Sequence, residues 1–301
     1  MNLTIGDALR IVKDRLAAGS SPDADAEELL GRLLGLERSD LLLQSGRGID
    51  AEHARRLDAW ITRRVAGEPI QYITGRAAFR DLDLAVDSRV LIPRPETEGL
   101  VEAVLEVLRE ESRRWPVPRV LDLGTGSGAI ALAIAAECPR AVVSATDLSA
   151  EALEVARANA SALGLEDRVE LAHGDWFGAV GGDDRFEVVV SNPPYIATGE
   201  WETLPHDVRS FEPQSALFSG SSGLDALREI VDEAPRHLVA GGLLALELAE
   251  MRAREVFEWL EGASDWSRVS LIDDLAGRPR VLLARREAGP AIAPAQWSEE
   301  R

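Results

Sequence analysis

The segment Val188-Val189-Val190-Ser191-Asn192-Pro193-Pro194-Tyr195 carries the residue types best suited to chemistry in this chain. Three β-branched residues predict the end of a buried strand, and the two prolines prevent that strand from continuing. An amide side chain and free backbone carbonyls then stand at the carboxyl edge of a sheet, where open α/β sheets bind ligands. The Asn192 oxygen and the Pro193 carbonyl can each accept one N–H of an incoming amino group, and Tyr195 can pack against a flat substrate group.

A proline-rich turn after a core strand is the alternative interpretation, and a second motif argues against it. The apolar strand expected at Arg119–Leu123 leads into Gly124-Thr125-Gly126-Ser127-Gly128 and then into a helix over residues 129–136. Alternating glycines let the backbone approach a ligand closely, and the helix N-terminus supplies free N–H groups. The next strand, over residues 141–146, ends on Asp147, whose carboxylate can accept both hydroxyls of a ribose. These two elements predict a nucleoside-containing ligand.

The pattern does not identify which nucleoside. Gly124, Gly126 and Ala129 also satisfy the dinucleotide pattern G-x-G-x-x-A, and Asp147 stands where an NAD-dependent enzyme places its acid. Gly174-Asp175-Trp176-Phe177 follows a further strand, where an acid and an indole can frame an adenine by hydrogen bonding and stacking. The alternative interpretation of Trp176 is a core tryptophan.

Composition and charge exclude several classes of protein. The 301 residues are 46% hydrophobic and 28% charged, as in ordinary globular proteins. The formal charge is −19 and Lys13 is the only lysine, which opposes direct nucleic-acid binding. The acidity would steer a basic protein partner, or it merely maintains solubility. Without an apolar run of about 18 residues or a basic amino-terminal start, we expect no membrane segment and a cytoplasmic protein. Cys138 is the single cysteine and the four histidines lack metal spacing, so no metal is expected.

The chain divides into four expected segments. Residues 1–75 repeat a helical apolar pattern, which predicts a small helical domain for packing or partner recognition. Residues 76–92 predict a β-hairpin linker, with one strand over 78–86 and a turn at Asp87-Ser88-Arg89 into Val90-Leu91-Ile92. Residues 93–287 alternate strands and helices and form the ligand-binding α/β domain. They include a long polar loop over 197–223, and loops of this length are usually functional or disordered. Residues 288–301 are expected to be a disordered tail.

Three features together predict an S-adenosylmethionine-dependent methyltransferase that acts on an amino or amide nitrogen. They are the glycine loop, the second strand that ends on an acidic residue, and the segment in which an amide residue is followed by two prolines and an aromatic residue. From about residue 3 to 285 the chain resembles the peptide chain release factor glutamine methyltransferases of the HemK/PrmC type. The segments that carry this resemblance are Gly67-Glu68-Pro69-Ile70-Gln71-Tyr72-Ile73-Thr74-Gly75, Ile92-Pro93-Arg94-Pro95-Glu96-Thr97-Glu98, Asp122-Leu123-Gly124-Thr125-Gly126-Ser127-Gly128-Ala129-Ile130-Ala131-Leu132, Asn192-Pro193-Pro194-Tyr195-Ile196 and Glu212-Pro213-Gln214-Ser215-Ala216-Leu217.

The resemblance implies a fold, a reaction and a partner. The fold is a Rossmann-like seven-stranded methyltransferase sheet preceded by a helical domain and a hairpin linker. The reaction is N5-methylation of the glutamine in the Gly-Gly-Gln motif of class I release factors. The cofactor S-adenosylmethionine is expected to contact the glycine loop, Asp147, Trp176 and Asn192. The substrate amide is expected to contact Asn192, Pro193, Pro194 and Tyr195, of which Asn192, Pro193 and Tyr195 are the expected catalytic residues.

Other functions remain open from sequence. A glutamine methyltransferase that acts on a ribosomal protein is the hardest alternative to remove. A nucleic-acid adenine amino-methyltransferase is opposed by the charge, and an NAD-dependent dehydrogenase has no use for Asn192-Pro193-Pro194-Tyr195. A non-catalytic ligand-sensing protein is the fourth possibility. One segment departs from the family, since Ala249-Glu250-Met251-Arg252 stands where the family usually has a glycine-containing loop followed by a glutamine.

Overall fold

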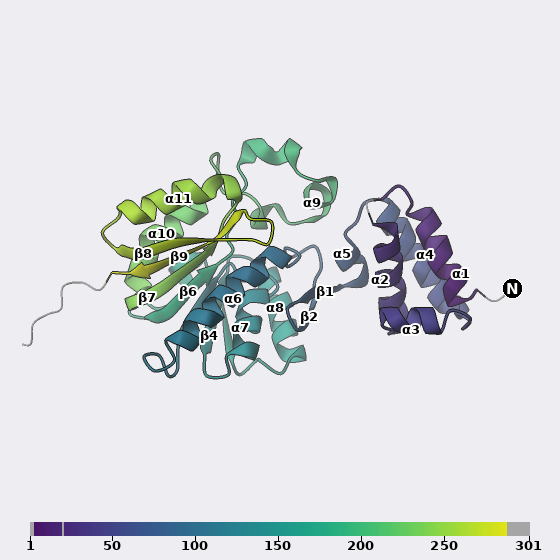
Figure 1. Ribbon diagram of the computed structural model, residues 1–301, viewed down its shortest axis with the longest axis horizontal. Coiled ribbons are helices and arrows are strands. Elements are labelled where there is room, and N and C mark those ends of the chain that lie inside the picture. Colours follow the sequence, from purple (N-terminus) through teal and green to yellow (C-terminus); the bar gives the residue numbers. More distant parts are fainter. Residues whose placement is uncertain (1–2, 20, 288–301) are drawn as a thin grey trace, which may run out of the picture.

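A seven-stranded mixed sheet forms the centre of the larger, carboxyl-terminal part of the protein in the computed structural model, which describes residues 3–19 and 21–287 (Figure 1). The strand order is β5-β4-β3-β6-β7-β9-β8; the first five of these strands run parallel, and β9 pairs antiparallel with both β7 and β8. This arrangement confirms the predicted α/β class. The strands are β3 (Arg119–Leu123), β4 (Val142–Asp147), β5 (Val169–His173), β6 (Phe186–Ser191), β7 (Leu238–Glu247), β8 (Trp266–Asp273) and β9 (Pro279–Arg286).

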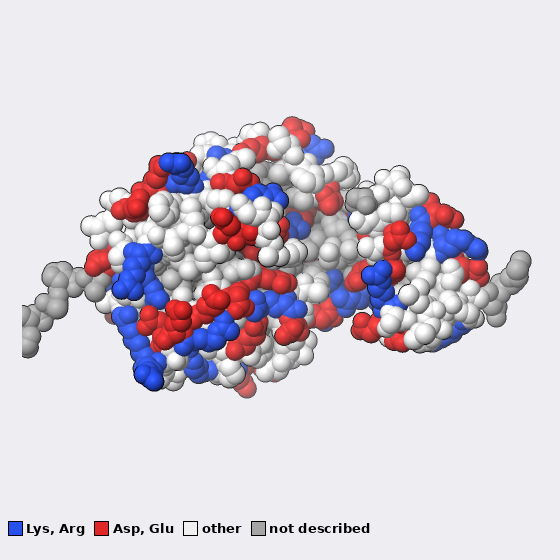
Figure 2. Space-filling view, viewed as in Figure 1, with Lys and Arg blue, Asp and Glu red and all other residues white. Residues whose placement is uncertain are grey.

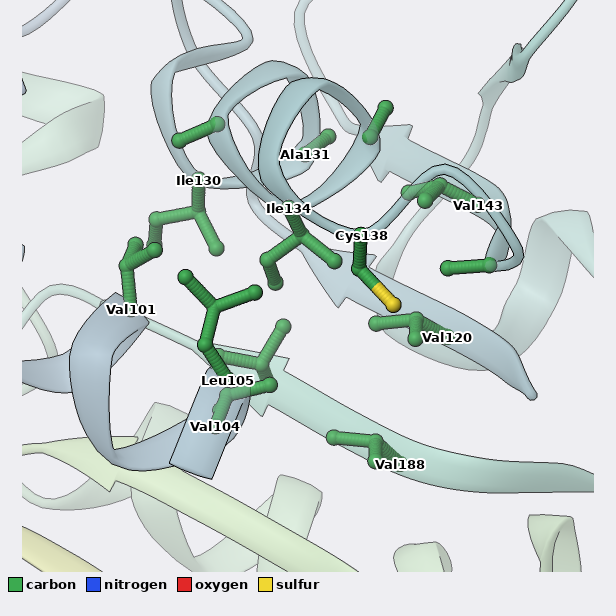
Figure 3. Close-up of a cluster of buried hydrophobic side chains, with 14 of the residues drawn as sticks. Val101, Val104, Leu105, Val120, Ile130, Ala131, Ile134, Cys138, Val143 and Val188 are labelled. Carbon is green, nitrogen blue, oxygen red and sulfur yellow. The ribbon is translucent and has the colours of Figure 1, made fainter. Parts of the chain in front are cut away.

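Helices cover both faces of the sheet, which explains why its central strands are apolar without alternation. Val188, Val189 and Val190 of β6 are all fully buried, because successive side chains enter opposite cores. Cys138 points into one of these cores, among valines, leucines and isoleucines, so this single cysteine packs as a small buried hydrophobic residue (Figure 3). One face is covered by α6 (Pro95–Glu110), α7 (Ala129–Glu137) and α8 (Ala150–Ala162), and the other by α10 (Asp225–His237) and α11 (Glu250–Gly262).

The amino-terminal helices bury a core of their own, apart from the two cores of the sheet (Figure 1). The first helix begins with a capping box between Thr4 and Asp7, and the second has Pro22 in its first turn, as helix starts favour. The helical pattern predicted before residue 75 is confirmed, whereas the predicted tail over 288–301 lies outside the described residues. The helices are α1 (Ile5–Arg15), α2 (Pro22–Leu34), α3 (Arg38–Leu43), α4 (Ala51–Val65) and α5 (Ile70–Thr74).

The hairpin between these helices and the sheet lies earlier in the chain than predicted. Strands β1 (Arg76–Phe79) and β2 (Leu82–Ala85) pair with Phe79 opposite Leu82, so the strand expected over 78–86 contains the turn, the end of β1 and all of β2, and residues 90–92 form no strand. The turn was missed because Arg80-Asp81 lacks the Asn-Gly or Asp-Gly signal of a two-residue loop. Arg80 takes a φ of +51° and is held there by carboxylates of α6 and α7. Its backbone N–H donates to Glu98, and its guanidinium pairs with Glu102 and Glu137.

The long polar loop after β6 is ordered by short helical turns. It contains the 3₁₀ turn η2 (Thr198–Thr203), α9 (His206–Phe211) and the 3₁₀ turn η3 (Gln214–Ala216). Ile196 and Leu217 close the loop at its base through a backbone hydrogen bond of 3.0 Å. The disordered alternative for this loop is therefore wrong, and a functional role for it stays a prediction.

One buried amide joins the hairpin to the glycine-rich segment. Asn159 of α8 accepts the Ala85 N–H at 2.7 Å and donates to the Ala85 carbonyl at 3.0 Å and the Ser127 carbonyl at 2.9 Å. It is almost fully buried, so all three partners depend on it for their hydrogen bonds.

Replacing Asn159 by Ala should therefore destabilise the protein. Three backbone groups lose their partner, and we expect the free energy of unfolding to fall by about 2–4 kcal/mol. Urea denaturation measures this change. Ser161→Ala, at an exposed position on the same helix, is the matched control and should shift stability by less than about 0.5 kcal/mol. An equal effect of the two substitutions would contradict the role given to Asn159.

Candidate active site

Three strand ends meet at one edge of the sheet. Leu123 of β3 pairs with Thr146 of β4 and with Ser191 of β6, so the residues that follow these strands leave the sheet side by side. The glycine loop, Asp147 and Asn192 therefore surround one point, as the sequence predicted.

A cavity of about 310 Å³ opens at this edge. Its size falls within the range of small-molecule sites, and most of its lining is backbone and apolar side chain with a few polar groups, as such sites usually have. Six of the predicted site residues line it: Gly124, Gly126, Asp147, Trp176, Asn192 and Pro194. The sequence reasoning missed other lining residues, among them Arg89, Ser149, Pro213, Ser215 and Ala216.

Asp147 holds the glycine loop in place. One carboxylate oxygen accepts the Gly126 N–H and the other accepts the Ser149 N–H, each at 2.8 Å. Burial raises the pKa of the Asp147 carboxyl, and these two hydrogen bonds oppose the rise. Each carboxylate oxygen keeps a further acceptor site, so hydroxyls of a ribose can still bind.

The position of Trp176 is compatible with both interpretations that the sequence left open. Its side chain lines the cavity and also packs against the core beneath α10. Its backbone has a φ of +40°. Gly124 has a φ of +72°, a left-handed conformation that favours glycine, and a Cβ atom at this position would only touch the Trp176 ring, at 3.4 Å. The indole is thus fixed against the glycine loop.

The other residues of the glycine loop lie outside the cavity lining. Thr125 and Ser127 are buried, and Gly128 precedes α7 with a φ of +86°. The Thr125 hydroxyl donates to Asp122 at 2.6 Å, and the Ala131 N–H donates to the same carboxylate oxygen at 3.2 Å. The structure therefore gives the Thr125 side chain a role in shaping the loop, and the predicted contact of Thr125, Ser127 and Gly128 with a cofactor stays a prediction.

A second cavity of about 190 Å³ adjoins the first. The two share Asn192 and Pro194, so Asn192 stands between them. Tyr195 lines only the second cavity, and burial raises the pKa of its hydroxyl to about 12, so it stays protonated at neutral pH. The residues common to both cavities are Leu91, Asn192, Pro194 and Ala216, and those of the second alone are Arg94, Pro193, Tyr195, Ile196, Leu204, Pro205, Val208 and Leu217.

The amide of Asn192 has a defined orientation. Its Nδ2 donates to the Thr97 hydroxyl of α6 at 3.1 Å, which leaves its oxygen as the acceptor for a ligand. Neither Thr97 nor its neighbours in sequence drew attention as site residues, because nothing local to residue 97 shows that it lies beside residue 192.

Two ion pairs hold the loop after β6 over the site. Arg94 pairs with the buried carboxylate of Glu212 at 2.5 Å, although the two residues are 118 positions apart. Arg252 pairs with Glu200 at 3.0 Å. Arg252 belongs to the atypical segment 249–252, which here begins α11 and holds the loop from the other side.

Charges of both signs are mixed over the surface that Figure 2 shows. Among the described residues, no group of three or more His, Cys, Asp or Glu side chains is placed to bind a metal ion. Within residues 3–19 and 21–287, each helix is too short or too polar to cross a membrane.

The fold and the cavity define a class of enzyme. Residues 101–206 match the family model of the methyltransferase small domain, and residues 7–75 match that of the PrmC N-terminal domain. The hMettl16 catalytic domain in complex with a MAT2A 3'UTR hairpin superposes with a TM-score of 0.55 at 14% identity, covering 81% of this chain and 84% of that one. A Thermus thermophilus 16S rRNA N2 G1207 methyltransferase, in complex with AdoMet and guanosine, gives 0.50 at 20% identity, covering 70% and 50%. These two structures support the methyltransferase fold.

Whole-chain relatives identify the family. The release factor glutamine methyltransferase of Cereibacter sphaeroides is 43% identical over 94% of this chain and 98% of its own. Those of Deinococcus radiodurans and Xylella fastidiosa are 44% and 46% identical, over 89% and 87% of this chain and 93% and 92% of their own. The chain belongs to the release factor glutamine methyltransferase family.

The buried carboxyl of Asp122 predicts a pH dependence of stability. Burial raises its pKa to about 7, well above the value in the unfolded chain. Between about pH 4 and pH 7 the folded state therefore binds a proton that the unfolded state does not, and stability falls as pH rises through this range. Glu247, Glu212 and Asp147 have raised pKa values too and contribute with the same sign. Asp122→Asn should reduce this pH dependence in urea denaturation between about pH 5 and pH 8; an unchanged slope would contradict it.

Proposed function

We propose that this protein transfers the methyl group of S-adenosylmethionine to the side-chain amide nitrogen of the glutamine in the Gly-Gly-Gln motif of class I release factors. The observation that carries the proposal is the position of Asn192 between two adjoining cavities. One cavity has the glycine loop and acid that suit a nucleoside, and the other has the Pro-Pro-Tyr wall that suits an amide. The relatives named for this reaction support the choice of substrate.

The residues present fit S-adenosylmethionine. Asp147 retains acceptor sites for the ribose hydroxyls, and the backbone of Gly124 and Gly126 leaves room for the methionine part. The Trp176 ring offers an apolar surface to the adenine. When bound there, S-adenosylmethionine supplies an activated methyl group.

The protein's own task is to orient a poor nucleophile. The lone pair of an amide nitrogen is delocalised, so its direction and distance decide the rate. The Asn192 oxygen and the Pro193 carbonyl each accept one amide N–H, which turns the remaining lobe of the nitrogen toward the methyl group. Positioning of this kind supplies roughly 7–11 kcal/mol of a barrier in favourable cases. The Tyr195 hydroxyl, with a pKa of about 12, is no base at neutral pH, so the released proton goes to water.

A protein substrate fits the charge of the molecule better than a nucleic acid does. The formal charge of −19 repels phosphates, and the mixed charges in Figure 2 form no continuous basic stripe on the face shown. The separate amino-terminal core provides a surface for recognition of a protein, and we assign residues 1–75 that role, 76–92 that of a linker and 93–287 that of methyl transfer. We infer that the reaction takes place in the cytoplasm, where release factors act.

Incubation of the protein with purified release factor and isotopically labelled S-adenosylmethionine tests the proposal directly. Mass spectrometry of the digested substrate should find one labelled methyl group on the Gly-Gly-Gln glutamine. A ribosomal-protein fraction and a DNA duplex, incubated in parallel, test the two alternative substrates. A label on either of these, with none on the release factor, would overturn the proposed substrate.

Two substitutions should separate cofactor binding from methyl transfer. Asp147→Ala removes the acceptor for the ribose and loosens the glycine loop, so S-adenosylmethionine affinity should fall at least about tenfold in calorimetry. Asn192→Ala should reduce that affinity less than Asp147→Ala does, because the contacts of Asp147 and the glycine loop remain, and it should lower kcat by about 100-fold or more, because the amide loses one of its two acceptors. Circular dichroism controls for folding. Unchanged turnover of Asn192→Ala would show that Asn192 is only a turn residue.

Removal of helices α1–α4 should impair recognition more than chemistry. A truncated protein that begins at Pro69 keeps α5, whose Tyr72 hydroxyl donates to the Val90 carbonyl at 2.5 Å beside the cavity. We expect it to bind S-adenosylmethionine normally, and to lose more kcat/KM with intact release factor than with a short Gly-Gly-Gln peptide. If part of the recognition is electrostatic, added salt should lower the rate of methylation of the intact release factor more than that of the peptide. Equal losses on both substrates would show that these helices only stabilise the fold.

A further inference from the structure

A buried carboxyl lies behind the amide that separates the two cavities. Ser191 of β6 pairs with Leu246 of β7, so Asn192 and Glu247 are the next residues along two adjacent parallel strands. Thr97, in the first turn of α6, lies next to both of them: its hydroxyl accepts the Asn192 Nδ2 at 3.1 Å, and the same hydroxyl stabilises the ionised form of the Glu247 carboxyl, which lowers the pKa of that group. Glu247 and Thr97 are both buried, and neither lines either cavity.

We propose that Thr97 and Glu247 are positioning residues, which fix the side-chain amide of Asn192 with its oxygen toward the substrate. The inference rests on the proposed methylation of an amide, because only a substrate with two N–H donors requires this orientation. It assigns a task to two residues that touch neither cavity.

The direction of the hydrogen bonds follows from the number of protons. A hydroxyl has one proton, and the ionised Glu247 carboxylate can only accept it. The Thr97 oxygen is then left with lone pairs alone, so it can bind the NH₂ group of Asn192 but not the oxygen. The reverse orientation of Asn192 would place two acceptors against each other. The chain Glu247–Thr97–Asn192 therefore selects one of two orientations that have nearly the same shape.

Protonation of Glu247 removes this selection. One Glu247 oxygen has no hydrogen-bond partner among the described residues, so a bound proton is better placed on the oxygen that faces Thr97. The proton is then donated to the Thr97 oxygen, and the hydroxyl proton becomes free to turn toward Asn192. Either orientation of the Asn192 amide is then satisfied, and the reversed one presents donors to a substrate that is itself a donor.

The charges around Glu247 place this change near neutral pH. Burial raises the pKa of the Glu247 carboxyl to about 7, the acidic Glu96 of α6 adds to the rise, and Thr97, Arg280 and Arg94 oppose it. Tyr195 also faces this carboxyl and stays neutral. Only the ionised Glu247 carboxylate selects the productive orientation of the Asn192 amide. Turnover should therefore decrease as the pH is lowered through about 7.

The hydroxyl is tested by Thr97→Val, which keeps the shape and removes both hydrogen bonds. We expect kcat to fall about tenfold or more while S-adenosylmethionine affinity changes by less than about twofold. Thr97→Ser retains the hydroxyl and should recover most of the lost turnover. Full activity of Thr97→Val, or an equal loss in Thr97→Ser, would overturn the proposal.

The carboxyl is tested by the pH profile of Glu247→Gln. The kcat of the wild type should decrease as the pH is lowered below about 7. The glutamine in the variant cannot ionise, so the kcat of the variant should not show this decrease between about pH 8 and pH 6. Asp122 also has a pKa of about 7, so a fall that persists in Glu247→Gln would assign the ionisation elsewhere and overturn the role of Glu247.

The orientation can also be measured without a substrate. In the free protein, the ¹⁵N–¹H signals of the Asn192 side chain should shift with pH in step with the ¹³C signal of the Glu247 carboxyl, and Thr97→Val should abolish this coupling. If the Asn192 signals do not shift while Glu247 titrates, the proposed hydrogen-bonded network of Glu247, Thr97 and Asn192 is refuted. Coupled signals in a protein that methylates no glutamine substrate would instead refute the proposed function and leave the hydrogen-bonded network standing.

Discussion

The parallel pairing of β3 with β4 and β6 is the constraint on which the site depends. Because parallel strands end at the same edge, three segments that are separate in sequence must leave the sheet next to one another. The pairing is stable because both faces of β6 are covered by helices, so its valines are buried whichever way they point. The apolar cores therefore determine where the polar groups meet, and the polar groups themselves contribute little to the choice of fold.

The loop that covers the site is held by residues from more distant parts of the chain than the strand ends that form the site. The Arg94–Glu212 pair joins the N-terminus of α6 to the loop after β6, and the Arg252–Glu200 pair joins that loop to α11. Burial of the Glu212 carboxylate means that its partner must stay in place, because an unpaired buried charge is costly. The loop can thus be long and polar and still present a fixed surface to a substrate.

Much of this arrangement was predictable from local sequence patterns. The strand over Phe186–Ser191 and the helix over Ala51–Val65 follow directly from apolar runs and periodicity, and the glycine loop marks the edge where ligands bind. The hairpin was misplaced because its turn depends on contacts of Arg80 with carboxylates of α6 and α7. Thr97 and Glu247 were not predicted as site residues for the same reason: the role proposed for them depends on strand order and on a helix from another part of the chain. Sequence patterns reveal residues that touch a ligand more readily than those that hold such residues in place.

The hydrogen bond from the Gly126 N–H to Asp147 has a consequence for ligand affinity. A glycine-rich segment has more backbone freedom to lose than any other, and a free loop would lose it at the moment of binding. Here the carboxylate orders the segment during folding. The loss of conformational entropy therefore lowers the stability of the fold and does not lower the affinity for a ligand. A ligand arriving at this edge meets a rigid cradle, and more of its contact energy remains as affinity.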